Sequence, residues 1–359
     1  MKIRYLLLLV LAFLIVTPQS RAQIGGESTY KFLSLPNSAR IAALGGNYLA
    51  AYDNDITLTL ANPSLITEDM HNNLGFSFVD YYTDINYGYA QYARTFNKIG
   101  TFVASLQFIN YGTFDRADET GQRNGTFNAG EYALNIGWGR RLHPHWTIGA
   151  NIKGIYSTFE AYNSFGLAVD VSGSYIHEDA GFTASLIARN IGLQLTSYYS
   201  GQTHPLPFEL QIGMSQSLKH LPLRFHLLYH NMQKWDLTYS DPLVVAENTD
   251  PITGEEKKKS GIADFGDKFM RHIVIGAELN ITDFLSLRGG YNYGRRQDNG
   301  VAAKMSTVGF SWGIGLRVSK FHFSYARSRY HLAGSPNYIT LTFNLQEFTK
   351  KRTAGESMQ

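Results

Sequence analysis

Histidines are the first residues in this sequence whose types and spacing could do chemistry, because an imidazole can bind a metal or transfer a proton near neutral pH. His143 and His145 flank a proline and could offer two ligands to one metal ion. Four more fall in segments of alternating polarity: His226, His230, His272 and His322. We expect the first two to lie in a solvated turn. We expect the other four to be polar wall residues bonded to neighbours or water, although they could also line a pore or bind an ion.

Charged side chains occur on the polar side of the same segments: Lys153, Asp170, Arg189, Glu209, Arg224, Glu278 and Arg288. We expect them to form ion pairs with each other or with the N-terminal part of the chain. A barrel hydrolase would need a serine, a histidine and an acid converging at its rim, and no nucleophile motif marks such a set. The absence of cysteine excludes thiol chemistry. We therefore expect no catalytic residue, no cofactor and no metal site, and a protein that is not an enzyme.

The segments that carry these residues alternate in polarity from about residue 74 to residue 346. In one of them Tyr132, Leu134 and Ile136 alternate with Ala133 and Asn135. A period of two predicts a strand with one apolar face. Many segments run about ten residues, as a tilted membrane crossing needs, whereas strands of soluble sheets are typically about 5–6 residues long. The sequence therefore favours an all-β fold, a transmembrane antiparallel up-and-down β-barrel of about 14 strands, over a soluble β-sandwich.

The links between the segments follow the pattern of an outer-membrane barrel. Short links are predicted at 97–98, 142–145, 177–179, 219–222, 282–283 and 319–320. Long links are predicted at 111–127, 191–206, 233–269, 294–303 and 327–337. In such barrels the tight turns face the periplasm and the longer loops face outside. We therefore expect a bacterial outer-membrane protein with these long links on the cell surface.

The chain begins with the features of a secretory signal peptide. Lys2 and Arg4 precede an apolar run over 5–16, and a small residue suited to cleavage follows at Ala22. We assign residues 1–22 to this signal, and no later run is long enough for a membrane helix. The signal contains three of the 32 lysines and arginines and none of the 29 acids, so the rest of the chain is neutral. The net charge of +3 is therefore no argument for nucleic-acid binding.

Residues 23–72 do not alternate, and we expect them to form a plug or hatch in the barrel lumen. Ser38 is suited to cap a short helix over 40–44 that ends at Gly45 and Gly46, and a turn or helix should start at 62–63. A barrel of this width would leak if it were unplugged. The alternative is a periplasmic extension outside the pore. We assign 73–348 to the barrel and 349–359 to a polar periplasmic tail.

Several segments of the chain carry distinctive motifs. They are QIGGESTYKFL (23–33), LPNSAR (35–40), ALGG (43–46), NP (62–63), DINYGYA (84–90), GEYALNIG (130–137), YNSFGLAVD (162–170) and QKWDL (233–237). Together they resemble the PorQ family, which supplies barrel components of the type IX secretion system of Bacteroidetes. The resemblance covers nearly all of the chain after the signal. It also implies similarity to FadL-type fatty-acid channels, which have fourteen strands and an N-terminal hatch.

The resemblance, and not composition or spacing, implies a role in the cell-surface attachment complex. There a sortase-like protease removes C-terminal signals from exported cargo and joins the cargo to anionic lipopolysaccharide, while a sister barrel shuttles the cargo. PorQ-like barrels tether a surface-exposed partner of the PorZ type. The expected function is therefore a non-enzymatic adaptor or anchor in the outer membrane. The alternative is a FadL-type channel for uptake of hydrophobic small molecules, which needs an apolar pocket and a lateral opening.

The 233–269 link is the most distinctive surface element of the sequence, since loops of this length are uncommon unless they are functional or disordered. It carries an apolar run beside a charge run, and these are the candidate partner-binding residues: Leu243, Val244, Val245, Lys257, Lys258 and Lys259. A flexible solvated loop is the alternative. We expect deletion of 241–260 to leave barrel insertion intact and to weaken retention of the partner.

Overall fold

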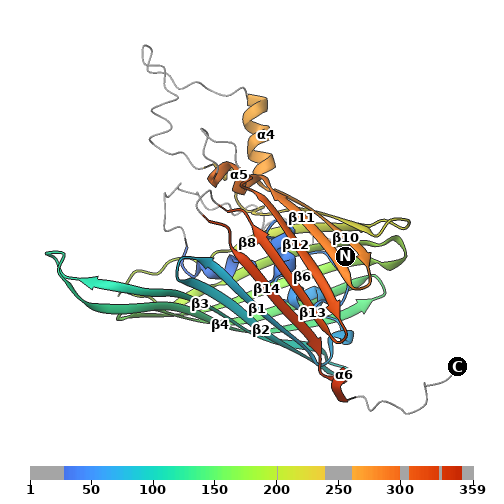
Figure 1. The fold of residues 1–359 in the computed structure, drawn as a ribbon, viewed down its shortest axis with the longest axis horizontal. Coiled ribbons are helices and arrows are strands. Elements are labelled where there is room, and N and C mark those ends of the chain that lie inside the picture. Colours follow the sequence, from blue (N-terminus) through green and yellow to red (C-terminus); the bar gives the residue numbers. More distant parts are fainter. Residues whose placement is uncertain (1–27, 200, 239–260, 300–306, 331–333, 350–359) are drawn as a thin grey trace, which may run out of the picture.

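The computed structural model describes residues 28–199, 201–238, 261–299, 307–330 and 334–349. Their strands form one closed antiparallel sheet in which each strand pairs with its neighbours in the chain and β1 pairs with β14 (Figure 1). The strands are β1 (Asn73–Tyr82), β2 (Ile85–Phe96), β3 (Gly100–Ala117), β4 (Arg123–His143), β5 (Trp146–Phe159), β6 (Tyr162–His177), β7 (Phe182–Thr196), β8 (Glu209–Ser217), β9 (Leu223–Tyr229), β10 (Ile273–Thr282), β11 (Leu285–Asn292), β12 (Phe310–Val318), β13 (Phe321–Ser328) and β14 (Asn337–Asn344). The predicted barrel of about 14 strands is confirmed.

The helices lie before, between and after the strands. The N-terminal segment, residues 28–72, contains η1 (Lys31–Ser34), α2 (Ala39–Ala43), η2 (Ile56–Leu58), η3 (Pro63–Leu65) and η4 (Glu68–Met70). The others are η5 (Glu178–Ala180), α4 (Gly261–Arg271), α5 (Tyr293–Asn299) and α6 (Gln346–Thr349). Among the described residues, no helix has the length and apolar character needed to cross a membrane.

The two faces of the sheet differ in polarity as the alternation predicts. On β4, Leu134 is 59% exposed whereas its neighbour Asn135 is 1% exposed, and on β5 Ile152 is 61% exposed whereas Lys153 is 1% exposed. Apolar side chains therefore cover the outside of the ring, and polar side chains are enclosed by it. This is the arrangement of a barrel that has lipid around it, and the inverse of a soluble sheet that buries its apolar face.

The links at one end of the barrel are short throughout, as predicted, but three links at the other end are short as well. Only 83–84 join β1 to β2, and only 160–161 join β5 to β6. The third is the link between β3 and β4. The predicted long link over 111–127 is wrong, because β3 continues to Ala117 and β4 begins at Arg123. These two strands extend past their neighbours as a long hairpin (Figure 1), so only 118–122 remain as a link.

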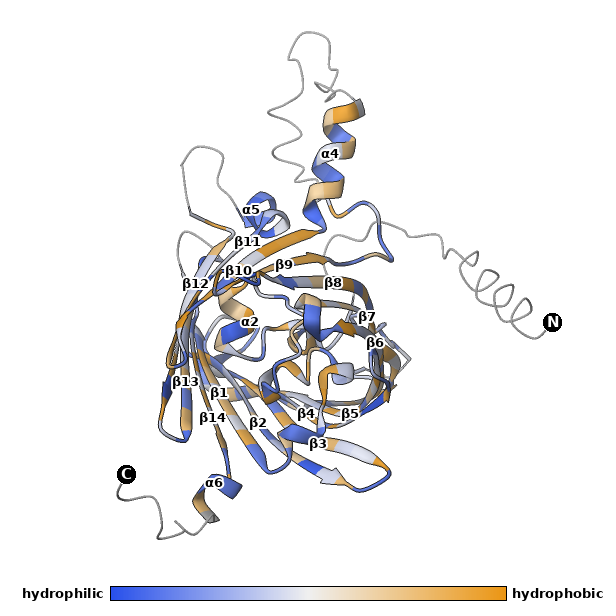
Figure 2. Cartoon of the chain, turned by 90° about the vertical axis from the view of Figure 1, so that its right-hand side faces the viewer, coloured by the Kyte–Doolittle hydropathy of each residue, from blue (hydrophilic) through white to orange (hydrophobic). Residues whose placement is uncertain are grey.

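The N-terminal segment contacts the inner face of the strands, and Figure 2 shows α2 within their ring. Its apolar side chains are buried, among them Phe32, Ile41, Leu44, Leu58 and Leu65. They pack with small groups of wall residues rather than with a second sheet. The barrel interior is thus where the apolar core of this molecule forms.

Several of the predicted features lie outside the described residues. These are the signal peptide over 1–22, all but the first residue of the tail predicted over 349–359, and all six candidate partner-binding residues, Leu243, Val244, Val245, Lys257, Lys258 and Lys259.

Candidate functional site: a charged network between the N-terminal segment and the barrel wall

The sequence at 38–46 forms the short helix that was expected of it. The Ser38 side chain accepts a hydrogen bond from the Ile41 backbone N–H and so caps α2. The helix ends where Gly45 and Gly46 take φ values of +102° and +91°, a conformation that disfavours side chains. This local geometry sets the direction in which Arg40 leaves the helix.

Wall side chains hold α2 at both ends. The Ala39 backbone N–H donates to Thr340 Oγ1 on β14 at 2.9 Å. Ser311 Oγ on β12 donates to the Ala43 carbonyl at 2.9 Å, and Ser328 Oγ on β13 donates to the Ala42 carbonyl at 3.0 Å. A helix of this length is not stable alone in water, so these bonds explain why it persists here.

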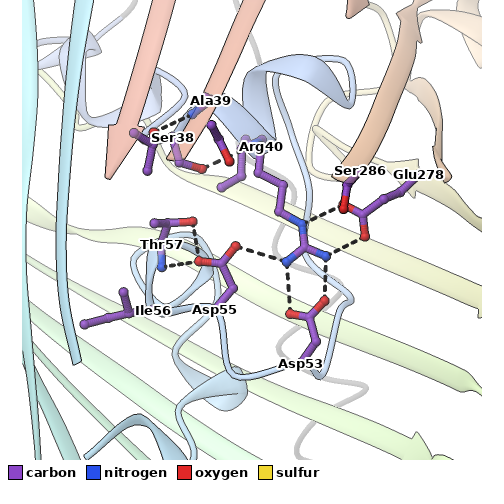
Figure 3. A network of polar contacts seen from close by, with 12 residues as sticks. Ser38, Ala39, Arg40, Asp53, Asp55, Ile56, Thr57, Glu278 and Ser286 are labelled. Carbon is purple, nitrogen blue, oxygen red and sulfur yellow. Dashed lines mark hydrogen bonds and ion pairs between the residues drawn. The ribbon is translucent and has the colours of Figure 1, made fainter. Parts of the chain in front are cut away.

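Arg40 is the centre of the network (Figure 3). Its Nε donates to Glu278 Oε2 at 2.9 Å and its Nη2 to Glu278 Oε1 at 2.8 Å, a bidentate pair with a residue of β10. Its Nη1 donates to Asp53 Oδ1 and to Asp55 Oδ2, both at 3.0 Å. The Arg40 side chain is buried, so a charged group here requires this set of acceptors.

Two arginines of the wall complete the network. Arg288 Nε lies 2.6 Å from Glu278 Oε2, and Arg224 Nη1 lies 2.6 Å from Asp53 Oδ2. Together with Arg40, they place three guanidinium groups against the carboxylates of Asp53, Asp55 and Glu278, so the formal charges balance. Burial raises the pKa of the Asp53 carboxyl, but the nearby Arg40 and Arg224 guanidinium groups outweigh burial and hold that pKa well below its usual range.

The network residues themselves line part of a cavity of about 590 Å³ that extends to the end of the barrel with the short turns. Its lining is mostly polar and includes Arg317, Lys320, His322, Asn344 and Glu347. Such a surface suits water and ions rather than an apolar ligand. Among the described residues, no three histidines or acids come together in a way that could hold a metal ion.

At the opposite end of the interior, a tyrosine cluster packs against the N-terminal segment. The cluster is Tyr81, Tyr87, Tyr89, Tyr330 and Tyr338. The Tyr87 ring meets those of Tyr81, Tyr89 and Tyr338 edge to face, with ring centroids 5.6–6.3 Å apart, and the Tyr81 ring meets that of Tyr330 in the same way. Tyr87 Oη donates to the Pro36 carbonyl at 3.3 Å and Tyr89 Oη to the Leu35 carbonyl at 3.2 Å. These rings fill the space between the segment and strands β1, β2 and β14.

The predicted ion pairing of the charged wall residues is confirmed for five of the seven. Lys153 Nζ lies 2.7 Å from Asp170 Oδ2, and Arg224, Glu278 and Arg288 belong to the network above. The other two find different partners. Glu209 lies 3.5 Å from His230 Nδ1, and Arg189 donates to the Leu33 carbonyl of the N-terminal segment at 3.3 Å.

The histidines are wall residues, as expected. The ring nitrogens of His272 lie 2.7 Å from the His230 carbonyl oxygen and 3.0 Å from the Trp235 carbonyl oxygen, and the nitrogen that has the proton donates to its neighbour. His322 accepts from Arg317 Nε at 2.7 Å, beside the cavity. His226 differs, because it packs edge-on against Tyr48 with centroids 4.2 Å apart and has no hydrogen-bond partner among the described protein atoms.

His143 and His145 stand at the short turn between β4 and β5, where a solvated turn was expected. His145 Nδ1 bonds to the Ile176 carbonyl at 2.9 Å, and its ring stacks on His177 with centroids 5.3 Å apart. The turn therefore uses the ring of His145 to join two neighbouring turns of the barrel.

Arg40 as the centre of the network was not predicted from the sequence, which singled out Glu278, Arg224 and Arg288 on the wall. The available signal was the group of charged residues, Arg40, Asp53 and Asp55, in a segment that is otherwise mostly apolar or small. Charges that a chain buries need partners of opposite sign, and these partners were the wall residues already identified.

Comparison of the sequence with protein-family models and with curated proteins finds no match. Among solved structures, the toluene transporter TodX of Pseudomonas putida aligns over 86% of this chain and 97% of its own, with a TM-score of 0.50 and 11% identity. The CymD monoaromatic hydrocarbon channel aligns over 88% of this chain and 99% of its own, with a TM-score of 0.49 and 9% identity. A FadL homologue from Pseudomonas aeruginosa aligns over 89% of this chain and 100% of its own, with a TM-score of 0.44 and 10% identity. The TodX likeness extends to the fold alone, and the resemblance to the PorQ family stays a prediction.

Proposed function

We propose that this protein is a closed barrel of a Bacteroidetes-type outer membrane in which residues 28–72 act as a luminal plug. The single observation that carries the proposal is the bidentate Arg40–Glu278 pair at the centre of a balanced charged network. An N-terminal extension outside the pore would have no reason to place a buried arginine against a wall carboxylate. The tyrosine cluster supports the same conclusion at the other end of the interior.

Closure distinguishes this barrel from an open pore. A barrel of intermediate width leaves a lumen that its own wall side chains do not fill, and here the N-terminal segment occupies it from the tyrosine cluster to the charged network. The remaining cavity of about 590 Å³ is polar and opens at the short-turn end. We expect that end to face the periplasm and the end with the longer links to face outside.

The full chain should therefore show no steady conductance in a planar lipid bilayer. Deletion of 28–70 should open a pore, and Arg40→Met should produce intermittent openings without removing the segment. A steady conductance of the unmodified protein would contradict the plug. The Arg40→Met measurement remains informative even if the deletion variant does not fold.

For such a barrel, the function that fits best is that of a non-enzymatic adaptor in the attachment complex of the type IX secretion system. Support comes from the PorQ-like motifs of the sequence and from an interior that is filled rather than shaped for transport. The partners would be a surface-exposed PorZ-type protein, the sortase-like protease and the sister shuttle barrel, together with outer-membrane lipopolysaccharide.

Purification of the tagged protein from native membranes, followed by mass spectrometry, tests the adaptor. The proposal expects stable surface partners with the full chain and weaker retention after deletion of 241–260. Deletion of 118–122, the tip of the β3–β4 hairpin, is the matched control for loop shortening. Equal partner recovery from both deletion variants would show that 241–260 does not contribute to partner retention. Absence of any partner from the full chain would contradict the adaptor function.

The second candidate is a FadL-type channel for hydrophobic small molecules, which the TodX-like fold favours. It requires an apolar binding pocket, whereas the cavity of about 590 Å³ beside the charged network is lined mainly by arginines, acids and amides. Lipid or aromatic compounds that co-purify with the protein, in place of partner proteins, would support the channel.

A further inference from the structure

Helix α4 (Gly261–Arg271) has one exposed apolar face. Figure 2 shows it projecting away from the ring of strands above β9 and β10. Ile262, Phe265 and Phe269 are 88%, 60% and 41% exposed. Their spacing of three and four residues places them on one side of the helix. Three large apolar side chains on one exposed face indicate a surface that water does not normally cover.

The opposite face of α4 is fixed by ion pairs and hydrogen bonds. Arg271 bridges Asp267, at 3.1 Å within the helix, and Asp298 of α5 at 2.7 Å. Tyr293 Oη, also of α5, donates to Asp267 Oδ1 at 2.8 Å. Because these contacts direct the polar face toward α5, the apolar face is held pointing away from it.

The apolar face of α4 continues the apolar outer surface of the barrel. The Phe269 ring meets Tyr229 at the end of β9 with centroids 5.7 Å apart. Tyr229 follows Phe225 and Leu227 on the outward side of the same strand, where these two are 48% and 44% exposed. Trp235 extends the surface further by packing on Phe265 with centroids 5.2 Å apart. One apolar row thus runs from the barrel wall onto the helix.

We propose that α4 is an interfacial helix that inserts its apolar face into the outer leaflet of the membrane beside the barrel. This inference rests on the proposed membrane location. The occupant is lipid because the face is continuous with the lipid-facing wall, and because a tryptophan lies at its edge, as at membrane interfaces. An inserted amphipathic helix lies about 5–10 Å into the boundary between headgroups and acyl chains. Its polar face, with Asp264, Asp267, Lys268 and Arg271, then stays in the headgroup region.

The helix would give the barrel a lateral anchor at its β9–β10 side. Because Lys268 also pairs with Asp236 at 3.0 Å, insertion would fix the residues around Asp236 as well as the helix itself.

The absence of cysteine in the chain allows a clean labelling experiment. Single variants Ile262→Cys, Ala263→Cys and Ile275→Cys carry the fluorophore NBD and are reconstituted in phosphatidylcholine vesicles. Ile262 is on the apolar face, its neighbour Ala263 is exposed on another side of the helix, and Ile275 is an outward residue of β10 that is 48% exposed. Quenching by nitroxide-labelled lipid is compared with quenching by aqueous cobalt.

We expect severalfold stronger lipid quenching at positions 262 and 275 than at position 263, and the reverse with cobalt. Lipid quenching at 275 combined with cobalt quenching at 262 would overturn the interfacial helix while leaving the membrane barrel intact. Cobalt quenching at 275 would overturn the membrane location itself. Equal lipid quenching at 262 and 263 would show that the helix has no preferred face toward the lipid, and would also contradict the inference.

Discussion

Arg40 and Glu278 are 238 residues apart in the chain, yet two hydrogen bonds of 2.9 and 2.8 Å join them inside the barrel. One belongs to the first α-helix of the described chain and the other to β10. The contact requires the N-terminal segment to lie inside the ring and β10 to be in register with its neighbours. The N-terminal segment can therefore make this contact only when β10 has taken its place in the barrel.

Loss of the Glu278 charge should destabilise the protein strongly. Glu278→Gln leaves the buried guanidinium groups of Arg40 and Arg288 short of a carboxylate, a loss that costs about 3–5 kcal/mol in comparable buried pairs. Unfolding by guanidinium in detergent micelles would measure it. Glu160→Gln is the control, because its pair with Arg116 is largely solvated and should contribute only about 0–1 kcal/mol. Equal losses in both variants would refute a special role for the buried network.

Acid should weaken the hold on the N-terminal segment through Asp53. Its folded pKa lies well below the usual range, so its contribution to stability is complete above the unfolded carboxyl pKa of about 4 and is lost progressively as the pH falls further. We expect the unfolding free energy to drop between about pH 5 and pH 2, and to drop less in Asp53→Asn. The comparison of the two slopes isolates Asp53 from the other carboxyls. Parallel slopes would mean that its ionisation is not linked to folding.

Much of the barrel could be predicted because membrane strands leave a period-two pattern, which Leu134 and Asn135 show directly. The pattern fails where a strand leaves the apolar belt. On β3, the residues from 113 to 117 are exposed on both faces, so no apolar face marks them as a strand. They are stabilised instead by pairing with β4, as in Thr113 with Asn128 and Phe114 with Phe127, and such pairing is invisible in one segment of sequence.

The candidate site was predictable only in its parts. Ser38, Gly45 and Gly46 carry local capping signals, and the polar parity of β10 places Glu278 inside. The pairing of Arg40 with Glu278 depends on the path that the segment takes through the lumen. That path is set by close contacts with the wall over long sequence separations, for which neither composition nor periodicity carries a signal.

A second buried pair should behave like the first. Lys153 Nζ contacts Asp170 Oδ2 at 2.7 Å and Asn190 Oδ1 at 2.8 Å, where the register of β6 and β7 breaks and Asn190 takes a φ of +56°. Lys153→Met should cost about 3–5 kcal/mol because the buried Asp170 loses its counter-charge. Adding Asp170→Asn should recover part of the loss. If the double variant is no more stable than Lys153→Met alone, the charge of Asp170 is not what the lysine compensates. Ile152→Met, on the outward face beside it, is a control that should cost less than about 1.5 kcal/mol.

The backbone of the N-terminal segment approaches the wall so closely that one methyl group should displace it. A Cβ at Gly149 on β5 would overlap the backbone of Pro63 and Ser64, whereas a Cβ at Gly154 on the same strand would meet nothing within 4 Å. Gly149→Ala should therefore cost about 1–3 kcal/mol through overpacking. It should also raise the frequency of channel openings in a planar bilayer, because the segment must shift to make room. Gly154→Ala should leave both unchanged. If Gly149→Ala lowers stability without any openings, strand β5 moves to make room for the methyl group and the N-terminal segment stays in place. That result would contradict the expected displacement of the segment.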